Sequence, residues 1–176
     1  MNVDPFHLNR PVHLARRDVF YEQAKQLIQE LPTHKDLEDQ HETVLKALAL
    51  FQDALHHANA ANQSNETTDK DLRFSYFLDA CVDNTQSITR MLRRQRSVNS
   101  KDSNLTTFLG SEDTSAKMAT HYRRCAAHIL KGTLHLLSHA EAPYHHLQQL
   151  TFDAMTSDER ARYEKARKHL LTAEQN

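Results

Sequence analysis

The segment KDLEDQHETVLKALALFQDALHHAN (residues 35–59) contains the pattern that decides the fold. One row of its residues recurs in alternating steps of four and three positions: Leu37, His41, Val44, Leu48, Phe51, Leu55 and Ala58. This spacing places the row along one stripe of an α-helix, and every member except His41 is apolar. The segment therefore predicts a long amphipathic helix that packs against other helices through this stripe.

Two further segments, residues 69–96 and 115–140, show the same spacing. In the first, the stripe consists of Phe74, Leu78, Cys81, Thr85, Ile88 and Leu92. In the second, it consists of Tyr122, Ala126, Ile129, Thr133, Leu136 and Ala140. Three long helices with matching stripes are what a left-handed bundle, packed at about 20°, requires.

Prolines divide the N-terminal part of the chain. Pro5 and Pro11 predict an extended arm over residues 1–11, because proline is poorly tolerated inside a helix. A first helix is expected after this arm, from position 12 or 18 to position 30, and Pro32 should end it.

The C-terminal part is expected to form two shorter helices. Pro143 should break the preceding helix, so residues 143–155 are predicted to be a separate element. Thr156 and Glu159 have the spacing of a capping box, in which each residue binds the backbone amide of the other. They predict the start of a last helix over residues 157–173.

Length and composition indicate one helical domain over residues 1–176. The 176 residues exceed the commonest domain size of about 100 to 150 only slightly. With two glycines and four prolines there is little material for tight hairpin turns, which favours helix. Polar loops are expected at 60–68 and 97–112. The predicted fold is all-α, an antiparallel bundle of three long helices with shorter N-terminal and C-terminal helices, about six in total.

The charge balance excludes some classes of function. Lys and Arg number 22 against 23 Asp and Glu, so no net field attracts the whole molecule to nucleic acid or anionic lipid. No apolar run is long enough to span a membrane and the start lacks the pattern of a signal peptide, which predicts a cytoplasmic protein and leaves non-classical secretion open. Catalytic and nucleotide-binding motifs are missing, so a noncatalytic protein without a cofactor is favoured.

Histidines form a second stripe on the helix expected at 115–140. His121, His128, His135 and His139 follow steps of seven, seven and four residues, with Cys125 and Gly132 between them. On a helical wheel this row lies roughly 110° from the apolar stripe, so it should flank the core. We predict that these four histidines contact a partner. Since an unperturbed imidazole titrates near about 6.5, a pH-sensitive surface is an alternative.

Some histidines also have the spacing of metal ligands. His135 and His139, at positions i and i+4, can share one ion, and Glu38 with His41 forms a Glu-x-x-His pair. These fragments resemble parts of hemerythrin-like and DinB-like metal bundles. The resemblance implies a metal-dependent bundle protein with His41, His135 and His139 as candidate ligands. A second Glu-x-x-His and a His-x-x-x-x-Asp are missing. We therefore expect no bound metal, and the metal-dependent bundle protein is an alternative.

A basic cluster lies near the end of the helix predicted at 69–96. It consists of Arg90, Arg93, Arg94 and Arg96. Cations at a helix C-terminus complement the helix dipole, and they can also contact a partner. Phosphate or nucleic-acid binding would require Arg16, Arg17, Arg123, Arg124 or Lys131 to join them on one face.

Together these patterns favour a noncatalytic helical interaction module, an adaptor, regulator or effector-like accessory protein. It is expected to bind another protein, or a second copy of itself, through the histidine stripe and the arginine cluster. An apolar patch exposed on the folded surface would mark the contact surface better than either.

Overall fold

The computed structural model describes residues 5–99 and 112–175. Its helices are α1 (Pro5–Glu30), α2 (Leu37–Ala61), α3 (Asp69–Asn99), α5 (Glu112–Ala154) and α6 (Ser157–Gln175), with a 3₁₀ turn at Leu31–Thr33. Within these residues no strand occurs, so the prediction of an all-α fold is confirmed. None of the described helices has a stretch long and apolar enough to cross a membrane.

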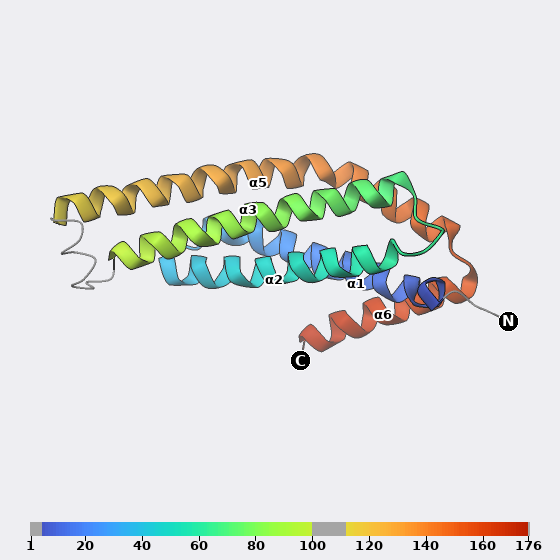
Figure 1. Ribbon diagram of the computed structural model, residues 1–176. Helices are drawn as coiled ribbons and strands as arrows, with labels where there is room; N and C mark the ends of the chain where they lie inside the picture. Colours follow the sequence, from blue (N-terminus) through green and yellow to red (C-terminus); the bar gives the residue numbers. More distant parts are fainter. Residues whose placement is uncertain (1–4, 100–111, 176) are drawn as a thin grey trace.

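The helices form an antiparallel bundle, as predicted. Packing joins α1 to α2, α2 to α3 and α3 to α5, while α6 lies along α1. Figure 1 shows α3 and α5 side by side above α1 and α2, with α6 below them. The described residues form five α-helices rather than about six, because the elements expected at 115–140 and 143–155 are one helix.

The predicted break at Pro143 is wrong. Helix α5 is 43 residues long and continues through Pro143 without a break. An interior proline costs about 3 kcal/mol because it lacks the N–H that would bind the carbonyl four residues earlier. The next turn buries Tyr144 and Leu147, which are 2% and 4% exposed. Burial of each contributes about 1.5 to 3 kcal/mol, which offsets the cost of the proline.

The predicted extended arm is also wrong for residues 5–11, which belong to α1. Pro5 lies at the start of the described part of α1, and proline is tolerated in the first turn of a helix, where its missing N–H has no helical partner. Pro11 lies inside the helix and is buried together with Arg10. Packing of this first part of α1 against the bundle thus outweighs the local preference of proline. Residues 1–4 lie outside the described part of the chain.

The predicted capping box is confirmed. The Glu159 amide donates to Thr156 Oγ1 at 3.2 Å, and the Thr156 amide donates to Glu159 Oε1 at 3.1 Å. These two bonds satisfy amides that the first turn of α6 leaves without helical partners. Helix α6 therefore begins at Ser157, as the sequence predicts.

Of the two predicted loops, only one lies within the described residues. The connection between Ala61 and Asp69 agrees with the loop predicted at 60–68, except that positions 60 and 61 are still helical. For the loop predicted at 97–112, residues 97–99 are helical and α5 has begun at Glu112. Residues 100–111 lie outside the described part.

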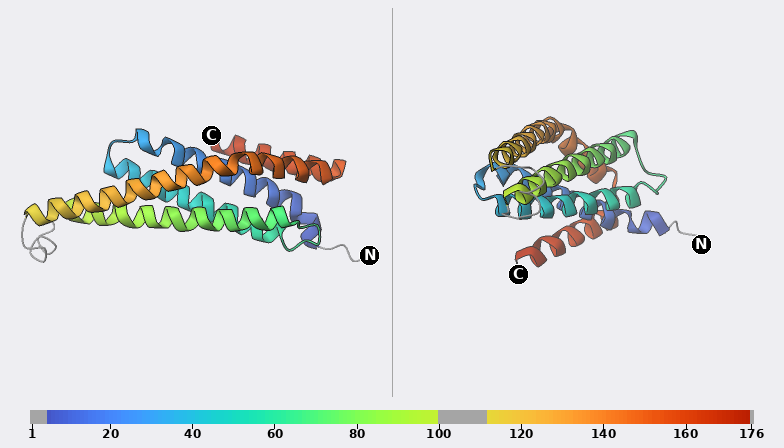
Figure 2. Two further views of the ribbon diagram at one scale, coloured as in Figure 1. Left: turned by 90° about the horizontal axis from the view of Figure 1, so that it is seen from above. Right: turned by 60° about the vertical axis from the view of Figure 1, so that its left-hand side comes forward.

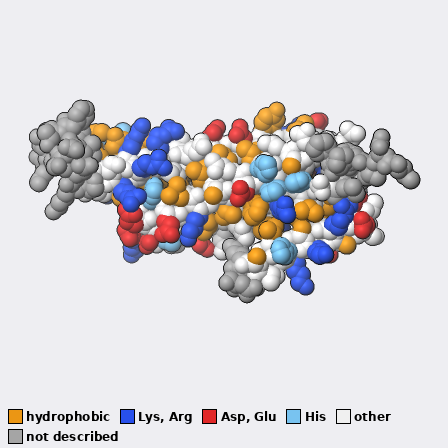
Figure 3. Space-filling view, turned by 60° about the horizontal axis from the view of Figure 1, so that its bottom comes forward, with side chains coloured by type: hydrophobic (Ala, Val, Ile, Leu, Met, Phe, Trp, Pro, Cys, Tyr) orange, Lys and Arg blue, Asp and Glu red, His pale blue; other side chains and the backbone are white. Residues whose placement is uncertain are grey.

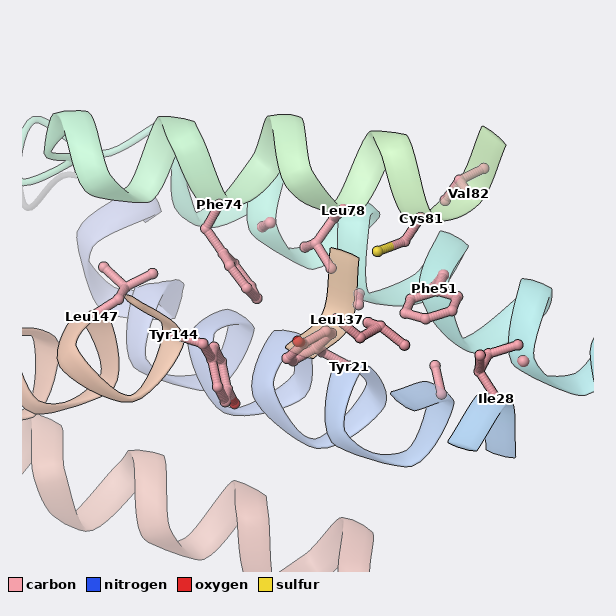
Figure 4. Packing of buried hydrophobic residues seen from close by; sticks show 14 residues of the cluster. Tyr21, Ile28, Phe51, Phe74, Leu78, Cys81, Val82, Leu137, Tyr144 and Leu147 are labelled. Atoms are coloured by element: carbon pink, nitrogen blue, oxygen red, sulfur yellow. The ribbon is translucent and has the colours of Figure 1, made fainter. Parts of the chain in front are cut away.

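Aromatic side chains from different helices make the centre of the core (Figure 4). Tyr144 of α5 packs against Tyr21 of α1, with ring centroids 4.7 Å apart, and against Phe74 of α3 at 5.2 Å. Tyr21 and Phe74 meet edge to face, also at 5.2 Å. Phe51 of α2 and Leu137 of α5 are fully buried beside them. Because four helices contribute, the C-terminal half of α5 is fixed on several sides.

A smaller apolar cluster lies toward the other end of the bundle. Its buried members are Leu31, Val44, Ile88, Leu92 and Ala126. Figure 2 shows that α3 and α5 extend beyond the turn between α1 and α2. The N-terminal half of α5 is therefore held mainly by α3.

Candidate partner-binding surface

All four histidines of the predicted stripe are exposed on α5. They are His121, His128, His135 and His139. Their position beside the core agrees with the expected flank. His135 and His139 form a pair, with Nε2 atoms 2.9 Å apart and ring planes almost perpendicular. Their predicted role in partner binding remains a prediction.

The arginine cluster is exposed at the end of α3, and two of its members have partners. Arg96 Nε lies 2.8 Å from Glu38 Oε1 at the start of α2. The guanidinium of Arg94 lies 5.8 Å from the centroid of the Tyr122 ring on α5. Exposed contacts of this type contribute at most about 1 kcal/mol each. Arg90 and Arg93, the other members, are exposed as well.

The basic residues that a phosphate site would need are divided between different places. Arg17 is 1% exposed and bound to acidic groups, so it cannot join the arginine cluster. Arg16 lies near His13 and His57 on α1 and α2, where burial first, and then neighbouring groups that include Arg16, lower the pKa of both. Arg123 and Arg124 remain exposed on α5, next to the Tyr122 ring that Arg94 contacts. Phosphate or nucleic-acid binding therefore stays an untested alternative.

The candidate metal ligands do not come together. Within the described residues, no group of three or more His, Cys, Asp or Glu side chains could hold an ion. His41 is 7% exposed, and burial followed by the charges of Arg96 and Arg93 lowers its pKa. Those two cations would also repel a metal ion. The described geometry therefore does not support the ligand set His41, His135 and His139.

An apolar hollow of about 490 Å³ lies between α3 and α5, and we call it the first hollow. Its apolar walls are formed by Phe74, Phe77, Leu136, Ala140, Pro143, Tyr144 and Leu147. The volume lies within the range of binding pockets, about 300 to 1,000 Å³. Apolar surface gathered in a hollow is a more specific sign of binding than single exposed apolar residues.

A second hollow of about 490 Å³ lies next to the first. Lys70 and Leu147 line both, so the two hollows form one surface, which we call the α3–α5 groove. The other lining residues of the second hollow are Arg10, Glu66, Thr68, Asp69, Asp71, Leu150, Thr151 and Ala154. The groove thus follows the start of α3 and the C-terminal half of α5.

Two cations, Lys70 and Arg73, and two histidines border the first hollow. Lys70 and Arg73 approach from α3, and His139 and His146 approach from α5. All four are exposed. His139 is the one predicted contact residue that lines the groove, so the histidine stripe reaches the groove only at its C-terminal end.

Large apolar residues are also exposed beside the groove. Tyr76 is 76% exposed, and it follows Arg73 by three positions, so the two are neighbours on the surface of α3. Leu150 is exposed in the second hollow. Tyrosine is frequent among the residues that dominate binding energy at interfaces.

A buried cluster of charges fixes the helices below the groove. Arg17 Nε donates to Asp18 Oδ1 at 2.9 Å, and Arg17 Nη1 lies 3.5 Å from Asp71 Oδ1. Arg10 Nη2 donates to Asp71 Oδ2 at 3.3 Å, and the Tyr163 hydroxyl of α6 donates to Asp18 Oδ2. Burial disfavours the charged form of Arg17, but Asp18 and the other nearby groups outweigh it and raise the pKa of this guanidinium. The cluster therefore joins α1, α3 and α6.

A histidine pair joins α1 and α2. The Nδ1 atoms of His13 and His57 lie 3.0 Å apart and their rings are stacked. Figure 3 shows histidines gathered among hydrophobic side chains on the face seen from the side of α1, α2 and α6. Burial, followed by His13, Arg16 and His56, lowers the pKa of His57 to about 4. This pair is therefore kept neutral at pH 7.

Most groove residues were not identified as a site from the sequence. Lys70, Arg73 and His146 carry no recognisable motif, and Leu147 belonged to an element expected to follow a break at Pro143. One signal was present: Phe74 and Phe77 together make the apolar face of α3 wider than a single seam needs. A wide apolar face indicates more contact surface than the bundle itself uses.

The chain matches no family model, no curated protein and no solved structure. Its function is therefore argued from the groove and its surroundings.

Proposed function

We propose that this protein is a noncatalytic helical interaction module that binds a protein partner in the α3–α5 groove. The observation that carries the proposal is the groove itself, two adjoining hollows between helices that are fixed from below, of which the first has mainly apolar walls. Grooves between helices commonly receive an amphipathic helix of another protein. The exposed residues Tyr76 and Leu150 beside it extend the apolar contact surface.

The rigidity of this part of the bundle also supports the proposal. A site built on packed helices needs little ordering when a partner binds, and ordering costs affinity. The walls of the first hollow include Phe74 and Tyr144, which are 6% and 2% exposed and belong to the aromatic core. The shape of the groove therefore depends on residues that the core holds in place.

Substitution of Ala140 tests this function. Ala140 lines the first hollow, so Ala140→Trp should fill it. Ala127 is exposed on the same helix but outside the groove, and Ala127→Trp is the matched control. Tagged wild-type protein and both variants are purified from the native cells, after circular dichroism has shown that each is folded. Proteins retained in stoichiometric amounts are then identified and quantified by mass spectrometry.

We expect a partner that is retained by the wild type and by Ala127→Trp and is lost from Ala140→Trp. If the partner is a second copy of this chain, the solution mass should fall by half in Ala140→Trp alone. Equal retention by both variants, or loss from Ala127→Trp alone, would contradict the proposal. Loss from Ala127→Trp alone would favour the exposed face of the N-terminal half of α5 instead.

A further inference from the structure

The α3–α5 groove has the length of an extended occupant. Its lining residues on α5 reach from Leu136 to Ala154. At about 1.5 Å per residue this distance is about 27 Å, or five helical turns. A small molecule would occupy one hollow, whereas a helix of about 20 residues would follow both. The concave form also fits a convex helix better than a flat bilayer surface.

The charges along the groove are uneven. The residues that line the first hollow include the cations Lys70 and Arg73 and no Asp or Glu. In the second hollow, Glu66 and Asp69 are exposed next to Lys70. The groove is therefore cationic at the first hollow and mixed at the second. A partner with carboxylates at one end would be bound in one direction.

The cations of the first hollow are available to a partner. Among the residues that the structure describes, neither Lys70 nor Arg73 forms an ion pair within 4 Å, in contrast to Arg96 with Glu38. Glu141 is the acidic residue of α5 closest in sequence to the residues that line the first hollow. Its Oε1 lies 3.6 Å from Nζ of Lys25 on α1. Its charge is thus engaged with α1 rather than with the cationic rim.

We infer that the occupant is an amphipathic helix whose apolar stripe is bordered by Asp or Glu where it covers the first hollow. This inference rests on the proposed function and adds the chemistry of the partner. The apolar stripe fills the hollows, and the carboxylates pair with Lys70 and Arg73. Rim charges of this kind mainly set specificity, association rate and salt dependence.

Two designed peptides of about 20 residues test the inference. Both carry Leu at helical positions i, i+3, i+4 and i+7 in an Ala background. One has Glu on both flanks of the Leu stripe and the other has Lys at the same positions. Binding to the full chain is measured by calorimetry, at low and at moderate salt. We expect the Glu peptide to bind about tenfold more tightly than the Lys peptide, with a preference that salt reduces.

Charge reversal on α3 locates the binding site. Arg73→Glu should weaken binding of the Glu peptide about fivefold to tenfold and strengthen binding of the Lys peptide. The matched control is Arg90→Glu, which changes another exposed arginine of the same helix outside the groove, and for which we expect less than twofold change. Both substitutions lie on the surface, so the fold should be retained.

The inference is overturned if the two peptides bind equally, if neither binds, or if Arg90→Glu has the larger effect. Vesicles of phosphatidylserine form a further arm. The protein could bind these vesicles, lose this binding in Arg73→Glu, and show no preference for the Glu peptide. That result would assign the cations of the first hollow to binding a membrane. If the peptides fail but Ala140→Trp still loses the cellular partner, the proposed function stands and only the partner's chemistry is wrong.

Discussion

The two ends of the α3–α5 pair differ, although the same four-three spacing produces both. We call them the groove end, which contains the C-terminal half of α5, and the arginine end, which contains Arg90–Arg96 and the N-terminal half of α5. At the groove end α5 buries Leu137, Tyr144 and Leu147 in contact with other helices. Among residues 114–129 at the arginine end, Ala126 is the one buried residue.

The difference shows that a stripe becomes a core only where enough helices cover it. At the groove end α1 and α2 also pack on the aromatic cluster, whereas α3 and α5 extend past the α1–α2 turn at the arginine end (Figure 2). The groove end is thus the fixed part of the pair. It is also the part where apolar surface remains open to a partner.

The largest expected difference in stability comes from replacing each of two tyrosines on α5 by alanine, one at each end. Tyr144→Ala should lower the free energy of unfolding by about 3 to 5 kcal/mol, because it removes a buried ring from the aromatic core. Tyr122→Ala, at the arginine end, should lower it by less than about 1 kcal/mol, since its contact is with the exposed Arg94. Urea unfolding measures both. Equal losses would show that the two halves of α5 are packed alike.

The second largest difference in stability is expected between breaking a buried ion pair at the groove end and breaking an exposed one at the arginine end. Asp71 is 2% exposed and pairs with Arg10 and Arg17, so Asp71→Asn removes the carboxylate that these two buried cations share and should cost about 3 kcal/mol. Glu38→Gln breaks only the exposed pair with Arg96 and should cost less than about 1 kcal/mol. Thermal and urea unfolding at one pH compare the two variants. A small effect of Asp71→Asn would contradict the proposed strength of the cluster below the groove.

A smaller effect is expected from pH at the groove end. The pKa of His57 is lowered to about 4 in the folded protein, whereas an unfolded histidine titrates near about 6.5. Between these values the unfolded chain binds the additional proton, so the contribution of His57 to stability is complete above about pH 6.5 and is lost as the pH falls toward 4. Because the ring is only half-buried, we expect a loss on the order of 1 to 2 kcal/mol.

His57→Asn checks this assignment. The groups that act on His57 are His13 and Arg16 of α1 and His56 of α2. Urea unfolding between pH 7 and pH 4.5 should show a smaller decline for His57→Asn than for the wild type. A profile unchanged by the substitution would mean that His57 is not the group that titrates.

The stripes predicted most of the fold from the sequence. Rows such as Phe74–Leu78–Cys81 specify which face of a helix is apolar, and the Thr156–Glu159 pair specified the start of α6. The two errors both concern proline. Pro11 and Pro143 lie in helices because tertiary packing outweighs a local cost of about 3 kcal/mol, and that packing depends on residues far away in the sequence.

Less of the candidate site could be predicted. His139 was identified because histidines at i and i+4 stand out in a sequence. Lys70 and Arg73 were not, since their role depends on their position opposite α5, which no local pattern reveals. The groove itself depends on how far apart two helices pack, and this spacing is set by the whole core.

Hydrogen exchange measured by mass spectrometry, with and without the Glu peptide, tests the central claim that partners bind at the groove end. We predict that added peptide slows exchange in residues 68–78 and 136–154 and leaves residues 88–99 and 114–131 unchanged. Slowed exchange confined to residues 88–99 and 114–131 would contradict the account and would assign recognition to the arginines and histidines of the other end.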